Sequence, residues 1–127
     1  MAANTAFRFP TYAKNKNNNA IKRTYDTQSV AYAATIAVAV KPNCANTLIQ
    51  VGTLTGALTL TVAQDQNCVG DILEFLFLSD GTGRVITYST GFVFVTATQT
   101  LVASKNGTSR FMWTGVAWME MSRTIQG

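Results

Sequence analysis

The fold of this chain is decided by a stretch of strict alternation, ALTLTVA at residues 57–63. From Leu58 to Val62, every second residue is leucine or valine, and threonines stand between them. Successive side chains of a β-strand point to opposite faces of a sheet, so one face of this segment is apolar and the other is polar. This period of two predicts a half-buried strand.

Short runs of the same kind fill most of the chain, and Gly, Asn, Asp or Pro separates many of them. We expect strands at residues 35–40, 46–51, 57–63, 71–78, 84–87, 92–95, 100–104, 109–113 and 116–121. No segment has the period of an amphipathic helix, and no internal repeat is evident. We therefore predict an all-β fold, a single β-sandwich or jelly roll of about eight strands with an extended N-terminal arm.

The segment DILEFLFL at residues 71–78 is apolar on both faces except at Glu74. A strand of this kind is typical of the centre of a sheet that is covered on both sides. We expect the domain core to cover one side and a contact between subunits to cover the other. Only 13% of the residues are charged while 47% are hydrophobic, which also favours an oligomer.

Three turns punctuate the second half of the chain. SDGTG at residues 79–83 predicts a turn before a return strand, in which Asp80 bonds to backbone amides. Asn106-Gly107 and Thr114-Gly115 each predict a hairpin. In the last hairpin we expect three methionines to crowd the face opposite Phe111 and Trp113; they are Met112, Met119 and Met121.

Trp113 and Trp118 have two interpretations. Large aromatic side chains commonly fill a core, and we favour that interpretation for the last hairpin. The alternative is that both tryptophans, together with Tyr88, form a surface that stacks on carbohydrate.

The charge of the chain is concentrated in its first quarter. Residues 1–25 hold five basic side chains and no acidic one, whereas residues 26–127 hold five basic and six acidic side chains. The net charge therefore divides into +5 and −1, which gives the total of +4. We interpret residues 1–25 as a basic arm and residues 26–127 as the β-body.

Aromatic residues punctuate this arm, and a plain disordered tail seldom carries so many. We predict an arm that becomes ordered on a neighbouring protein, although residues 7–12 could instead form an edge strand of their own domain. The predicted docking residues are Phe7, Arg8, Phe9, Tyr12, Lys14, Lys16, Lys22 and Arg23.

The composition argues against catalysis. The chain has no histidine, which removes most general-base, triad and metal-centre schemes. Asp71 and Glu74 are three residues apart on a strand and so point to opposite faces, which disfavours them as a catalytic pair. We expect no enzymatic activity, no cofactor and no metal site.

Cys44 and Cys68 each lie near a turn. The chain opens without the charged start and apolar run of a secretory signal, so we expect synthesis in a cytoplasm and free thiols as the default. A disulfide between the two remains the alternative. No apolar run approaches the ~20 residues that span a bilayer, so we expect no membrane contact.

The isoelectric point of about 9.3 raises nucleic acid as a partner. The basic residues of the body are sparse and are not interleaved with aromatics on one surface, as a nucleic-acid binder usually requires. The arm alone could touch phosphate, but an acidic protein surface suits it as well. We do not expect nucleic acid to be the partner.

The order of strands and turns over about residues 30–123 resembles a known group of proteins. The runs that carry the resemblance are GALTL at 56–60, VGDILEF at 69–75, DGTGRVITY at 80–88, GF at 91–92 and FMWTGVAWME at 111–120. They look like small β-rich virion proteins of tailed bacteriophages, which include head decoration, head-fibre and tail-fibre-like domains.

This resemblance implies a non-enzymatic capsid decoration, or cement, subunit that is often a homotrimer. Its partners would be the major capsid protein or other virion proteins, which the N-terminal arm would contact. Its location would be the virion, assembled in the cytoplasm of a bacterial host. The alternative is a receptor- or carbohydrate-binding module of a fibre or tail.

Overall fold

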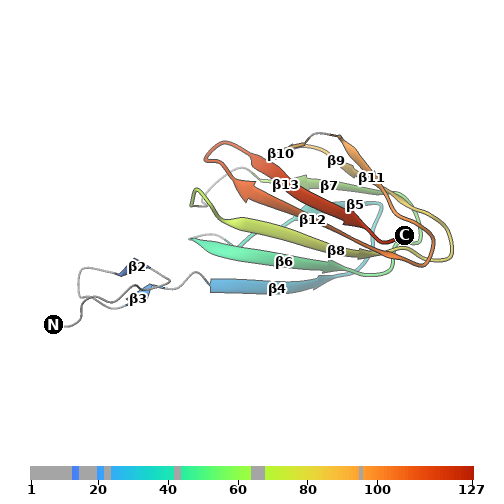
Figure 1. Cartoon of the computed structure of the whole chain (residues 1–127), viewed down its shortest axis with the longest axis horizontal. Coiled ribbons are helices and arrows are strands. Elements are labelled where there is room, and N and C mark those ends of the chain that lie inside the picture. Colours follow the sequence, from blue (N-terminus) through green and yellow to red (C-terminus); the bar gives the residue numbers. More distant parts are fainter. Residues whose placement is uncertain (1–12, 15–19, 22–23, 42–43, 64–67, 95) are drawn as a thin grey trace.

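The computed structural model describes residues 13–14, 20–21, 24–41, 44–63, 68–94 and 96–127. Every regular element in these ranges is a strand, so the predicted all-β fold is confirmed for this part of the chain (Figure 1). The strands are β2 (Ala13–Lys14), β3 (Ala20–Ile21), β4 (Thr24–Val30), β5 (Thr35–Val38), β6 (Ala45–Val51), β7 (Leu58–Val62), β8 (Ile72–Leu78), β9 (Val85–Tyr88), β10 (Phe92–Val93), β11 (Thr98–Thr100), β12 (Asn106–Trp113) and β13 (Trp118–Ile125).

Two sheets form the body. The large sheet has six strands in the order β10-β13-β12-β8-β6-β4, and the small sheet has four in the order β11-β9-β7-β5. From β4 to β9 the chain alternates between the sheets, and each strand from β6 to β9 pairs in parallel with the strand two elements earlier in the same sheet. The chain is thus wound as a β-solenoid with three coils, β4–β5, β6–β7 and β8–β9.

This winding corrects the predicted connectivity of a sandwich or jelly roll. In those folds antiparallel strands are joined by hairpins and Greek-key connections, whereas here the connections carry the chain to the opposite sheet. The turn at residues 79–83 illustrates the difference. The strand that follows it does not return beside β8 but crosses to the small sheet and pairs in parallel with β7.

An antiparallel hairpin closes the solenoid. β12 pairs antiparallel with both β8 and β13, and the turn at Thr114-Gly115 is the predicted hairpin. The hairpin predicted at Asn106-Gly107 is wrong, because both residues lie within β12. The turn comes earlier, where the Lys105 amide donates to the carbonyl of Val102. Ser104 has a φ of 59° in this turn.

The core lies between the sheets, and aromatic rings from both sheets meet there. The ring of Tyr88 in the small sheet lies 5.2 Å from that of Phe111 and 5.4 Å from that of Phe92, between ring centroids. Phe75 contacts all three of these rings. The alternation at residues 58–62 is also confirmed, since leucine and valine are buried there and the threonines are partly exposed.

Trp113 and Trp118 are core residues. Their exposed fractions are 4% and 0%, and that of Tyr88 is 1%. The interpretation that these three rings stack on carbohydrate is therefore wrong, because a ring must be accessible to stack on a sugar. The two indoles pack on each other with their ring centroids 5.4 Å apart.

A buried polar network ties the two sheets together. The Tyr88 hydroxyl lies 2.5 Å from Oε1 of Gln99 and 2.8 Å from the Ser109 hydroxyl. Because the Gln99 oxygen can only accept, Tyr88 donates to it and accepts from Ser109. The Gln99 amide nitrogen donates to the carbonyls of Thr108 and Thr124. Burial raises the pKa of Tyr88 far above its ordinary value, so the phenol stays protonated.

Cys44 and Cys68 form a disulfide, which corrects the expectation of free thiols. Their Cα atoms are 4.8 Å apart, within the range that a disulfide needs, although 24 positions separate them in sequence. The physical reason is the solenoid. Cys44 precedes β6 and Cys68 precedes β8, and these strands are neighbours in consecutive coils. A bridge across a loop of this length contributes about 3.5 kcal/mol in the chain-entropy account.

Candidate docking surfaces

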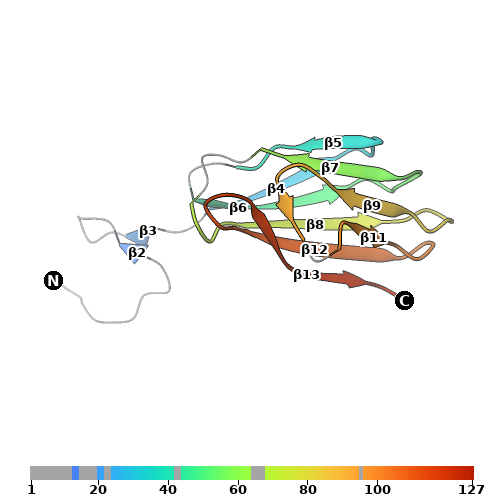
Figure 2. The ribbon, with the colours of Figure 1, turned by 90° about the horizontal axis from the view of Figure 1, so that it is seen from above.

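The predicted docking arm lies almost entirely outside the described residues. Phe7, Arg8, Phe9, Tyr12, Lys16, Lys22 and Arg23 all fall there, and of the predicted set only the backbone of Lys14 is described. Lys14 belongs to β2, which pairs antiparallel with β3. Figures 1 and 2 show these two short strands beyond the end of the body where β4 starts, apart from both sheets.

The body begins at the edge of the large sheet. β4 starts at Thr24, inside the segment predicted as arm, and pairs in parallel with β6 on one side only. Its other side is a sheet edge. The side chains of Asp26 and Gln28 both point toward the interior side of the sheet, while their neighbours in the strand point outward. The Gln28 amide donates to Asp26 and to the carbonyl of Ala39. An inward carboxylate is one of the devices that protect a sheet edge from unwanted pairing.

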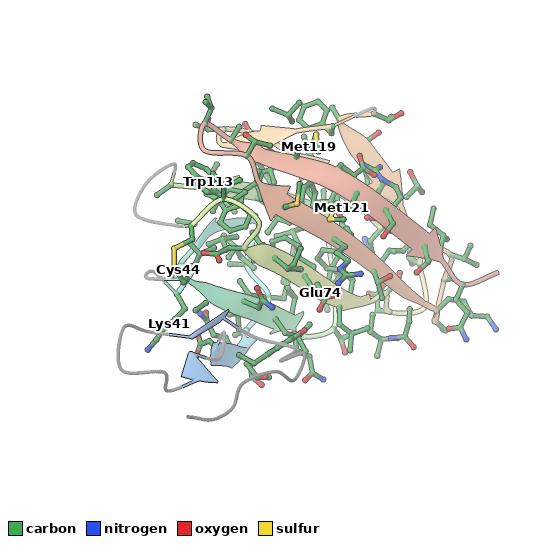
Figure 3. All side chains as sticks on the ribbon, turned by 60° about the vertical axis from the view of Figure 1, so that its left-hand side comes forward. Lys41, Cys44, Glu74, Trp113, Met119 and Met121 are labelled. Atoms are coloured by element: carbon green, nitrogen blue, oxygen red, sulfur yellow. A yellow bond between two sulfur atoms is a disulfide. The ribbon has the colours of Figure 1, made fainter. Side chains whose placement is uncertain are left out.

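The outer face of the large sheet is the broadest candidate surface. We define it as the side chains of that sheet that alternate with the buried ones. The register places across this face Tyr25, Thr27, Ser29, Asn46, Leu48, Gln50, Ile72, Glu74, Leu76, Leu78, Asn106, Thr108, Arg110, Met112, Met119, Ser122, Thr124 and Val93. Met121 is the extra residue of β13 at the bulge opposite Arg110 and Phe111. Figure 3 shows Glu74, Met119 and Met121 on this sheet, and Cys44 and Lys41 at the end nearest β2 and β3.

The three methionines lie where the sequence predicted them. Met112 is partly buried, while Met119 and Met121 are 40% and 49% exposed. Tyr25 and Val93 are also exposed on this face. Flexible methionine side chains adapt to irregular partners, so these residues give the face an adaptable apolar surface.

A polar cluster lies at the centre of this face. Glu74 of β8 is in register with Arg110 of β12, and its Oε2 lies 3.2 Å from Nε of Arg110. The Tyr25 hydroxyl reaches from β4 and donates to Oε1 of Glu74 at 2.5 Å. This hydrogen bond, together with partial burial, raises the pKa of Tyr25 above its ordinary value.

The surface is hollowed at this cluster. A shallow cavity of about 420 Å³ opens over Glu74 and Arg110, and its lining includes Leu48, Leu76 and Thr108. A second cavity of about 390 Å³ adjoins it toward the ends of β4, β6 and β8, with Ser29, Gln50 and Leu76 in its lining. Both cavities are open, so the outer face can accept protruding side chains from another surface.

The described carboxylates outside this cluster bond to the fold itself. Asp71 is buried and accepts the backbone amide of Cys68. As predicted, it lies on the face opposite Glu74. Asp80 accepts the Thr82 amide, as predicted for this turn, and also binds Arg84. The hydrogen bond from Arg84 lowers the pKa of Asp80 below its ordinary value.

Two further observations concern the described part of the chain. It contains no group of three or more His, Cys, Asp or Glu side chains placed to hold a metal ion. No helix long and apolar enough to cross a membrane occurs among these residues.

The Glu74–Arg110 pair was missed by sequence reasoning. A signal for half of it existed, because Glu74 is the only charged residue in the apolar segment from Ile72 to Leu78. Its partner lies 36 positions away in sequence, by the difference of the two residue numbers, on a strand whose pairing depends on the long-range winding. No local pattern identifies such a partner.

A scan against models of known protein families finds no match for this chain. A search of curated proteins finds no relative either.

Proposed function

We propose that this protein is a non-enzymatic structural subunit of a tailed-phage virion, and specifically a capsid decoration subunit that docks on the shell through its N-terminal arm and stabilises it. The observation that carries the proposal is the division of the molecule. The first 25 residues hold a charge of +5, while the body that follows is close to neutral. The described strands of the arm, β2 and β3, lie apart from the two sheets (Figure 2).

The energetics favour docking by part of the arm. Fixing a residue costs about 1–2 kcal/mol of conformational entropy. Burial of Phe7, Phe9 and Tyr12 returns roughly 1.5–3 kcal/mol each. Three anchors cannot offset two dozen fixed residues, so the arm must form backbone hydrogen bonds with its partner or become ordered only around the anchors. Many copies on a lattice would add avidity.

The body suits a structural role. Two facing sheets enclose one aromatic core, a layered form like the sandwich that the resemblance implies, although the strands are connected differently. A disulfide between the second and third coils and a buried Tyr88 network stiffen this block. The rigid body would cover the shell while the arm holds it there.

The alternative function, a receptor- or carbohydrate-binding module of a fibre or tail, is less well supported. Its candidate stacking residues were Tyr88, Trp113 and Trp118, and all three rings are buried in the core. A glycan would have to bind elsewhere on the body, and its binding would not depend on the arm.

Deletion of residues 2–23 tests the proposal. The truncated chain keeps β4 and the whole body, so it should retain the circular dichroism spectrum and melting temperature of the full chain. It should no longer cosediment with capsid shells of the encoding virus that lack this protein. Shell binding that survives the deletion unchanged would contradict the proposal, as would arm-dependent binding to DNA that weakens steeply with salt.

Two pairs of variants separate charge from apolar anchoring. Lys14→Gln with Lys16→Gln should weaken shell binding at low salt, whereas the body control, Lys41→Gln with Lys105→Gln, changes the net charge equally and should not. Phe7→Ala with Phe9→Ala should weaken binding by roughly 100-fold at any salt concentration, because two buried rings are lost.

A further inference from the structure

We infer that the outer face of the large sheet is a self-association surface, on which a second copy of this chain packs about a two-fold axis that runs parallel to the strands between β8 and β12. The inference does not depend on a virion role. It concerns how the body pairs with itself.

The charge of this face fits a copy of itself. Among its described residues, Glu74 and Arg110 are the two charged side chains, so the face carries one negative and one positive charge. A nucleic acid or an anionic lipid surface would select a face with net positive charge. A neutral face with one charge of each sign is instead suited to a partner that presents the same two charges in the opposite order.

The register shows how a two-fold axis would exchange them. Glu74 and Arg110 are directly opposite each other on neighbouring strands. A two-fold axis between these strands, lying in the plane of the contact, places β8 of one copy over β12 of the other. Each Glu74 then faces the partner's Arg110, and each Arg110 faces the partner's Glu74. Such an isologous contact uses the same patch on both copies.

The same axis brings apolar side chains together. Ile72 is in register with Met112, so each Ile72 faces the Met112 of the other copy. Leu48, one strand beyond β8, is in register with Glu74, so it faces Ser122, which is in register with Arg110 one strand beyond β12 and directly follows Met121. The central cavity of about 420 Å³ gives the long Arg110 side chain of the partner a place to enter. The two charges, the apolar side chains and the cavity are therefore all compatible with the same two-fold rotation.

The available area is sufficient for a stable dimer. Six strands spaced about 4.8 Å apart, with about seven residues of 3.3 Å each, cover on the order of 650 Å². Two copies would bury roughly 1,300 Å², which lies within the range of specific interfaces. The inference therefore assigns the body a two-fold symmetric dimer in place of the trimer that the resemblance implies.

The experiment measures the mass of the full chain in solution by light scattering after size exclusion. The wild-type protein should have twice the chain mass of 13.7 kDa, about 27 kDa. Glu74→Arg leaves two positive charges on the face and Arg110→Glu leaves two negative ones. Each variant alone should dimerise roughly 100-fold more weakly, because like charges then meet across the axis.

Mixing the two variants provides the decisive comparison. An equimolar mixture of Glu74→Arg and Arg110→Glu chains should recover the dimer, because a positive face then meets a negative one. The ion pair within each chain is broken in both variants, and mixing cannot restore it. The double variant, Glu74→Arg with Arg110→Glu, should also dimerise. Thr100→Arg, an exposed position in the small sheet, is the control that should leave the mass unchanged.

Several outcomes would overturn the inference. These are a wild-type monomer of 13.7 kDa at high concentration, a trimer, or a mixture that stays monomeric. If a charge reversal impairs folding, Met119→Lys tests the same face at an exposed position, and it should weaken the dimer without changing the melting temperature of the monomer.

Discussion

The two faces of β8 differ sharply although they belong to one strand. Leu73, Phe75 and Phe77 point inward and are almost fully buried, whereas Ile72, Glu74 and Leu76 point outward and are only partly covered. The inner face supplies the contacts that fold a single chain. The apolar residues of the outer face are only partly buried in the single chain and contribute less to that fold. Their apolar character would be explained by burial against another surface.

Chemically matched groups occur on both sides of the large sheet. The interior side has an ion pair between Arg123 and Glu120, and the outer face has one between Arg110 and Glu74. The interior holds the hydroxyl of Tyr88, and the outer face holds that of Tyr25. The same chemistry therefore lies in two environments, and substitution of each pair separates the requirements of folding from those of association.

The largest difference should come from apolar truncation. Phe75→Ala removes a ring that contacts four other aromatic rings and should lower the free energy of unfolding by about 3–5 kcal/mol. Leu76→Ala, its neighbour on the outer face, should cost the monomer about 1 kcal/mol or less, because that side chain is only partly buried. Chemical denaturation at low protein concentration measures both, and equal losses would contradict the distinction between the faces.

Loss of the interior ion pair should have the next largest effect. Arg123 donates to Glu120 and to the carbonyls of Thr96 and Thr98, so it joins β13 to the edge of the small sheet. Arg123→Met should lower stability by about 2–3 kcal/mol, because several charge-assisted hydrogen bonds disappear.

Arg110→Met is the matched substitution on the outer face. Arg110 is half exposed, and an exposed ion pair contributes about 1 kcal/mol at most. Its main effect should be on the mass in solution. If thermal denaturation of the dilute protein showed that Arg110→Met costs as much as Arg123→Met, the outer pair would have to be regarded as part of the fold.

The smallest difference should come from the two tyrosines. Tyr88→Phe leaves the buried Gln99 oxygen without its donor and should cost about 1–3 kcal/mol. Tyr25→Phe removes an exposed hydroxyl that bonds to Glu74 and should change monomer stability by about 0.5 kcal/mol at most. Denaturant midpoints of the two variants at pH 7 provide the comparison, and a Tyr88→Phe protein as stable as wild type would contradict the importance of the buried network.

Local patterns in the sequence predicted much of the strand content. The alternation at Leu58–Val62 and the hairpin at Thr114-Gly115 are both present, because each depends on residues close together in the chain. The two-sided apolar segment at β8 is central in the large sheet, as its composition indicated. The core positions of Trp113 and Trp118 also follow from their size and apolar character.

The winding could not be predicted in the same way. Parallel neighbours are separated by 21 positions between Thr24 and Ala45, by 26 between Thr47 and Leu73, and by 28 between Leu58 and Ile86, as their residue numbers give. Coils of unequal length leave no periodic trace in the sequence, so no repeat was evident. The disulfide could be named only as the alternative to free thiols for the same reason, because the proximity of Cys44 and Cys68 depends on the stacking of the coils.

The disulfide also determines how the molecule would respond to mechanical tension. Force applied through residues before Thr24 first loads β4, whose seven registered pairs with β6 are arranged in shear. If that ladder and the four registered pairs between β5 and β7 give way, residues 24–43, a count of 20 by their numbers, are released and add about 70 Å of extended chain. The force then reaches Cys44 and passes through the covalent bridge to Cys68, so the second coil carries no load. Under tension the first coil would therefore unfold first, and the bridge would keep the force from unfolding the second coil.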